Sequence, residues 1–125
     1  MFEAQILIVG AEDTSVFSPW FPRQGDNFKA TLDLVAVSGD SHSLKVEVFT
    51  KNGEDTGDGV NADNGATPQN ITRTTVGRSS ATWKSDSLTP GLEELVRYKF
   101  TASGTQGDSV TFRMLPPVWF DDVRA

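Results

Sequence analysis

The fold is decided by FKATLDLVAV at residues 28–37 and LKVEVFTK at residues 44–51, two runs joined by the turn-forming GDSHS at residues 39–43. The second run alternates between apolar and polar residues in the same way as the first. Alternation with a period of two across a short polar turn predicts an antiparallel hairpin with one buried face. In the first run that face is predicted to carry Phe28, Ala30, Leu32, Leu34 and Ala36.

The same alternation recurs towards the C-terminus. Residues 95–103 are predicted to be a strand with Val96, Tyr98, Phe100 and Ala102 inward. Residues 110–115 alternate similarly, and the Pro116-Pro117 pair is expected to end that strand. Residues 71–76 and 81–85 also have strand character, with a turn expected at 77–79 and Trp83 in the core.

The N-terminal part has weaker strand signals. Residues 2–9 form a plausible first strand that places Phe2, Ala4, Ile6 and Ile8 on one face. Residues 16–22 form a short extended piece whose two prolines forbid a central strand. Only residues 90–96 could hold a helical turn.

Together these patterns predict an all-β chain, a single-domain antiparallel β-sandwich over residues 1–125, jelly-roll-like, with about seven to eight strands. Residues 52–70 are rich in Gly, Asn and Asp and are expected to form a long flexible loop. Residues 116–125 are expected to form a C-terminal tail.

Composition narrows the classes of function. Eleven basic residues against seventeen acidic ones give a net charge of −6, which argues against nucleic acid as a partner. The absence of cysteine excludes a disulfide framework, a thiol nucleophile and a Cys-ligated zinc. The longest apolar stretch near the N-terminus is residues 6–9, so no signal peptide, transmembrane segment or membrane partner is expected. We therefore expect a cytoplasmic or virion location.

The sequence shows no organised catalytic group, and we expect no enzyme activity. The single histidine, His42, lies in a predicted turn. Gly39-Asp40-Ser41 resembles the nucleophile block of GDS-type esterases, but their Asp-x-x-His element is missing. The same tripeptide recurs at residues 107–109, which favours turn chemistry. The carboxylate pairs at 93–94 and 121–122 would point to opposite faces of a strand, which is poor geometry for a glycosidase.

The acidic loop at residues 54–64 offers the oxygen ligands that calcium prefers, but its spacing does not match an EF-hand. We therefore predict no cofactor and no metal site, with irregular calcium binding in this loop as the alternative.

Two aromatic clusters remain. The first is a Pro-bounded loop and the second is the C-terminal tail, and each includes an arginine. Trp and Arg dominate the binding energy of many protein interfaces. We predict these residues as an interface, with plugging of the open sandwich ends as the alternative: Phe17, Trp20, Phe21, Arg23, Trp119, Phe120 and Arg124.

In its size and strand pattern the chain resembles small all-β accessory or decoration proteins of tailed-phage particles. This resemblance implies a non-catalytic structural or assembly protein that binds a major shell protein or itself as a homo-oligomer. The alternative is a carbohydrate-binding or other ligand-binding sandwich module, in which Trp20, Trp119 or Tyr98 would stack on sugar rings. A hydrolase that uses a metal bound in the acidic loop is a third hypothesis.

Overall fold

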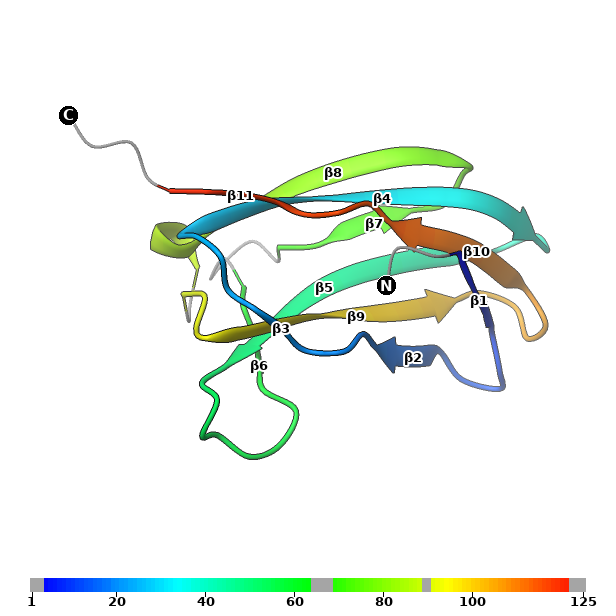
Figure 1. The fold of residues 1–125 in the computed structure, drawn as a ribbon. Helices are drawn as coiled ribbons and strands as arrows, with labels where there is room; N and C mark the ends of the chain where they lie inside the picture. The colour runs from blue at the N-terminus through cyan, green and yellow to red at the C-terminus, as the bar shows by residue number, and fades with distance from the viewer. Residues whose placement is uncertain (1–3, 64–68, 89–90, 122–125) are drawn as a thin grey trace.

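Two antiparallel sheets pack face to face with one hydrophobic core between them (Figure 1). The computed structural model describes residues 4–63, 69–88 and 91–121. Over these residues the regular structure is strand, apart from a 3₁₀ turn, η1 (Ser85–Ser87). The predicted all-β sandwich is therefore confirmed.

Each sheet is four positions wide. Across the first sheet run β1 (Gln5–Ile8), β10 (Ser109–Met114), β4 (Asn27–Ser38) and β8 (Gly77–Lys84). Across the second sheet run β2 (Thr14–Phe17), β9 (Leu95–Ser103), β5 (Ser43–Lys51) and β7 (Ile71–Arg73). Three short strands extend these positions: β3 (Phe21–Pro22) beside β9, β6 (Val60–Asn61) beside β5 and β11 (Val118–Phe120) beside β4.

The pairing order is that of a jelly roll. When the short strands are counted with the positions they extend, the eight positions pair as first-eighth-third-sixth and second-seventh-fourth-fifth. The described chain has eleven strands where seven to eight were predicted. The surplus consists of the three short strands β3, β6 and β11.

The core follows the predicted alternation. Phe28 is fully buried on β4 and stacks on Trp83 of β8 with ring centroids 5.5 Å apart. The predicted inward residues of β5, β9 and β10 are at most 3% exposed: Leu44, Val46, Val48, Val96, Tyr98, Phe100, Ala102, Val110, Phe112 and Met114. One face of each strand therefore supplies the core, as period-two patterning requires.

A β-bulge in β4 corrects one of the predicted core residues. Thr111 pairs with Ala36 and Phe112 pairs with Leu34, so Val35 is an extra residue on β4. Beyond the bulge the inward phase moves from even to odd residues. Ala36 is therefore exposed and not buried as predicted, while Val37 packs against the core.

β1 turns the predicted isoleucine face outward. Leu7 and Val9 are buried, whereas Ile6 is 64% exposed and Ile8 is 60% exposed. Ala4 is exposed as well, and Phe2 lies outside the described residues.

Several predicted boundaries were wrong. Residues 77–79, predicted as a turn, belong to β8, and η1 precedes residues 90–96, the candidate stretch for a helical turn. β6 lies in the segment predicted to be irregular, and Ala62 beside it is fully buried. The predicted tail contains β11, which pairs with residues 27–29 of β4. β6 and β11 are ordered by pairing with the long strands β5 and β4.

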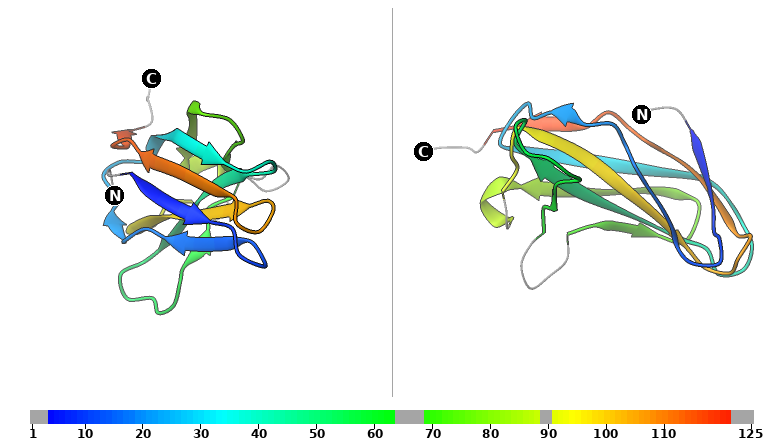
Figure 2. Two further views of the ribbon diagram at one scale, coloured as in Figure 1. Left: turned by 90° about the vertical axis from the view of Figure 1, so that its right-hand side faces the viewer. Right: turned by 90° about the horizontal axis from the view of Figure 1, so that it is seen from below.

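The connections gather at two ends of the sandwich (Figure 2). The turn end carries the connections β1–β2, β4–β5, β7–β8 and β9–β10. The loop end carries the connections β3–β4 and β8–β9, the segment after β5, and the end of β11. The described residues contain no helix with the length and apolar character needed to cross a membrane.

Candidate functional site

The predicted interface residues do not form one cluster. Successive side chains of a strand point to opposite faces of the sheet, so aromatic rings that are adjacent in sequence point in different directions. Three locations are found: Phe17 and Trp20 lie on the outer face of the second sheet, Phe21 and Trp119 pack against the core, and Arg23 and Phe120 lie at the loop end. Arg124 lies outside the described residues.

The outer face of the second sheet carries what we call the Arg97 cluster, formed by Phe17, Trp20, Asp58 and Arg97. The Arg97 guanidinium carbon lies 3.7 Å from the ring centroid of Phe17 and 4.3 Å from that of Trp20. Its Nη2 donates to the backbone oxygen of Asp58 at 2.9 Å and to a carboxylate oxygen of Asp58 at 3.1 Å. Arg97 is only 9% exposed. The cluster therefore fixes the segment after β5 onto the sheet.

Cations stack on the aromatic rings of the Arg97 cluster. Lys51 Nζ lies 4.8 Å from the Trp20 ring centroid, in addition to Arg97. Gly59, with φ of +80°, allows the chain to approach this ring, because a Cβ there would lie 2.7 Å from Trp20 Cη2. Tyr98, one of the three rings considered for sugar stacking, is fully buried. Tyr98 therefore cannot present a platform to a sugar.

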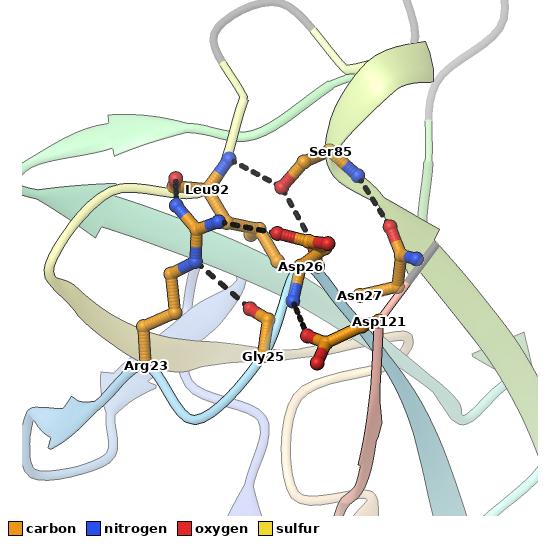
Figure 3. A network of polar contacts seen from close by, with 7 residues as sticks. All are labelled: Arg23, Gly25, Asp26, Asn27, Ser85, Leu92 and Asp121. Atoms are coloured by element: carbon orange, nitrogen blue, oxygen red, sulfur yellow. Dashed lines mark hydrogen bonds and ion pairs between the residues drawn. The ribbon is translucent and has the colours of Figure 1, made fainter. Parts of the chain in front are cut away.

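Arg23 is committed to a structural network at the loop end (Figure 3). Its Nε donates to the backbone oxygen of Gly25 at 2.8 Å, and its Nη1 donates to that of Leu92 at 2.6 Å. Its Nη2 pairs with a carboxylate oxygen of Asp26 at 3.1 Å. The guanidinium fork therefore joins the β3–β4 connection to the segment before β9.

Ser85 extends this network to the first sheet (Figure 3). Its Oγ donates to the backbone oxygen of Asp26 at 2.6 Å and accepts the N–H of Leu92 at 3.2 Å. Its N–H donates to Asn27 Oδ1 at 3.0 Å. Asp121, just beyond β11, accepts the N–H of Asp26 at 3.2 Å. At the loop end the network therefore joins the β3–β4 connection to η1, to the segment before β9 and to the residue after β11.

Two open, polar depressions lie towards the loop end. The larger, of about 640 Å³, is lined by Arg23, Gly25, Asp26, Asn52, Leu92, Glu93, Glu94 and Asp121. The smaller, of about 410 Å³, is lined by Thr50, Lys51, Asp55, Thr56, Asp58, Gly59, Val60 and Glu93. In the described part of the chain, no three His, Cys, Asp or Glu side chains are placed to hold a metal ion together. Asp58 and Asp55 face different partners, Arg97 and the N–H of Asn52.

The residues that resemble an esterase block lie at the turn end. His42 Nδ1 lies 3.1 Å from the backbone oxygen of Gly39, within its own turn. Asp108, in the second copy of the tripeptide, accepts the N–H groups of Ser41 and Thr105, each at 3.1 Å. Both copies therefore serve the geometry of turns, as their recurrence predicts.

The exposed apolar side chains favour one sheet. Among the described residues, five of the eight large exposed hydrophobic ones belong to β1, β4 and β11 of the first sheet: Ile6, Ile8, Val35, Val118 and Phe120. Trp119 packs inward, so its neighbours on β11 face away from the core. Thr111 pairs with Ile6 on one side and with Ala36 on the other, which brings the β1 isoleucines close to the bulge. We call Ile6, Ile8, Val35 and Ala36 the bulge patch.

Sequence reasoning missed the bulge patch and the Arg97 cluster for different reasons. Residues 6–9 are apolar on both faces of a strand, and this was an available signal that the outer face is apolar too. The contact of Arg97 with Phe17 depends on the pairing of β2 with β9, which no local pattern indicates.

No family model, no curated protein and no solved structure matches this chain. The geometry of its own residues is therefore the basis for assigning a role.

Proposed function

We propose that this chain is a non-catalytic structural subunit that docks on a larger protein assembly through the outer face of its first sheet. The observation that carries the proposal is the concentration of exposed apolar side chains on that face. Single exposed apolar residues are ordinary, but several on one face are typical of protein contact surfaces. A virus particle is the specific assembly that we propose, with a major shell protein or further copies of the chain as the partner.

The loop end supports this proposal over a small-ligand module. Arg23, the cation that lines the larger depression, already bonds Gly25, Asp26 and Leu92. On the outer face of the second sheet, Arg97 already stacks on the rings of Phe17 and Trp20. The exposed apolar residues of β1, β4 and β11 instead lie on an outer sheet face, which offers a broad contact suited to another protein.

The test is co-sedimentation with particles from the virus or cell that encodes the chain. We expect the wild-type protein to sediment with a particle at a fixed ratio. A Val118→Lys/Phe120→Lys variant should remain at the top of the gradient, because each lysine would have to be desolvated in the contact.

Val60→Lys is the matched control, since Val60 is 59% exposed but lies on the second sheet. Failure of the wild-type chain to join any particle would contradict the proposal. Equal loss of binding by the control would contradict the assignment of the face.

A further inference from the structure

We propose that β1 forms an antiparallel pair with β1 of a second copy of this chain, centred on Leu7. This inference rests on the proposed function and deepens it, because it names a second copy as a partner and gives the pairing at the edge of the proposed face. It rests on the backbone orientation of β1, on the residues that β1 lacks and on the side chains that it exposes.

The backbone of β1 has an open side. The N–H of Val9 donates to the oxygen of Asp108 and the N–H of Gly107 donates to the oxygen of Val9, both at 2.8 Å. Backbone groups alternate between the two sides of an antiparallel strand, so those of Gln5 and Leu7 also face β10, and those of Ile6 and Ile8 face outward. Within the described chain no strand pairs with that outward side.

A second copy fits this open side in one symmetric register. With a two-fold axis at Leu7, Ile6 of each copy lies opposite Ile8 of the other copy, which gives two such pairs. These two residues are the ones whose backbone groups face outward, so both pairs form hydrogen-bonded pairs of a regular ladder. The oxygen of Ile8 already accepts the Thr14 hydroxyl at 3.0 Å, and a carbonyl oxygen can accept a second hydrogen bond.

β1 lacks the features that protect the other edges. Proteins commonly prevent edge pairing with charged residues or proline. The β2–β3 edge contains Pro19 and Pro22, β8 carries Arg78 and Lys84, and β7 carries Arg73. Gln5–Ile8 contains neither a charge nor a proline, so a second copy brings no like charges together within the pair, although each chain carries a net charge of −6.

The side chains favour the same arrangement. Ile6 and Ile8 are 64% and 60% exposed, and in the pair each becomes the cross-strand neighbour of the other copy's isoleucine. The two first sheets would merge into one continuous sheet, with the two bulge patches on the same outer face. The second copy therefore covers apolar surface as well as open backbone groups.

The test is the mass of the full chain by sedimentation equilibrium, in wild-type protein and two double variants. The wild type should approach twice the chain mass of 13.6 kDa as its concentration rises. Ile6→Lys/Ile8→Lys places lysine opposite lysine in both pairs and should give monomer. Ile6→Lys/Ile8→Glu places lysine opposite glutamate in both pairs and should recover the dimer.

Val76→Lys is the control, because Val76 is 55% exposed on the β7–β8 turn, away from β1. It should remain dimeric, and circular dichroism should show all variants folded. A wild type that stays monomeric would overturn the inference, as would a dimer that survives Ile6→Lys/Ile8→Lys. Equal loss of the dimer in both double variants would overturn the register.

The two proposals can fail separately. A monomeric chain that still sediments with a particle would remove the β1 pair and leave the assembly role. A chain that dimerises through β1 but joins no particle would do the reverse.

Discussion

The two ends of the sandwich are held in contrasting ways. The turn end is organised by one buried carboxylate, that of Asp108, which is 6% exposed and accepts the backbone N–H groups of Ser41 and Thr105. The loop end is held by a spread of surface contacts around Arg23, whose side chain is about one-third exposed. The comparison teaches that short turns can depend on a single acceptor, whereas long connections distribute their constraints over many weaker ones.

The two ends also differ in their buried polar atoms that lack a hydrogen-bond partner. Five buried side-chain polar atoms in the described chain have no hydrogen-bond partner, and four of them belong to residues in the half of the sandwich towards the loop end: Asn61 Oδ1, Trp83 Nε1, Arg97 Nε and Tyr98 Oη. Each such atom lowers stability, because it loses water without gaining a partner. The loop end is therefore the less optimised half.

The largest predicted effect is the loss of the Asp108 carboxylate. Asp108→Ala leaves the N–H groups of Ser41 and Thr105 without their acceptor, and we expect about 3 kcal/mol less stability in urea unfolding. Asp40→Ala on the neighbouring turn is the control and should change stability by less than about 0.5 kcal/mol, because Asp40 is exposed. Equal effects would mean that Asp108 does not organise this end.

Gly39→Ala tests whether Asp108 and Gly39 act as a unit. Gly39 has φ of +103°, and a Cβ there would lie 1.9 Å from an Asp108 carboxylate oxygen. We expect a loss of about 2 kcal/mol in the wild-type background. In an Asp108→Ala background the loss should fall to about 1 kcal/mol, since the collision with the carboxylate disappears and only the backbone strain and a close contact of 3.0 Å with the Cβ of residue 108 remain. Additive losses would show that the two residues are independent.

Arg23→Ala is the corresponding test at the loop end. It removes the donors to Gly25, Leu92 and Asp26, but the freed backbone acceptors can be hydrated at the surface. We expect a loss of about 1 kcal/mol by thermal unfolding, smaller than that of Asp108→Ala. Arg23→Lys should lose nearly as much, because an ammonium cannot reproduce the fork. A loss larger than that of Asp108→Ala would reverse the comparison.

The smallest effect, of opposite sign, is expected at Tyr98. Its hydroxyl is buried and lacks a partner among the described residues, so Tyr98→Phe should raise stability by about 0.5 kcal/mol. A loss of stability would show that the hydroxyl has a partner.

Tyr98 also gives a pH dependence with a defined sign. Burial raises the pKa of the Tyr98 phenol well above its usual value of about 10. The unfolded chain releases this proton at a lower pH than the folded chain. Ionisation of Tyr98 therefore leaves the free energy of unfolding unchanged below pH 10 and lowers it as the pH rises above 10. Tyr98 is the chain's only tyrosine, so tyrosinate absorbance reports it directly, and the Phe variant should lack this component.

The long strands could be predicted from sequence because their alternation is uninterrupted. β5, β9 and β10 each bury the residues that their pattern indicates. The bulge at Val35 could not be predicted, since one extra residue shifts the phase without any change in composition. β6 and β11 are two and three residues long and depend on the strand beside them, so a local pattern does not indicate them.

The candidate site was harder to predict than the fold. Phe120 is 40% exposed while its neighbour Trp119 packs on Phe28, with ring centroids 4.9 Å apart. The two rings were grouped because they are adjacent in sequence, but they lie on opposite faces of β11. The contact of Arg97 with Trp20 requires β2 and β3 to be paired with β9, which is distant in the sequence.

The pairing of β1 with β10 has a consequence for how the chain reaches this structure. Gln5 lies opposite Phe112, so β1 leaves the ribosome long before β10, the strand with which it pairs. During that wait Leu7 has no partner strand, and closing so long a loop costs entropy before any contact compensates it. Slow folding and capture of the unpaired β1 segment by chaperones are the expected result of this connectivity.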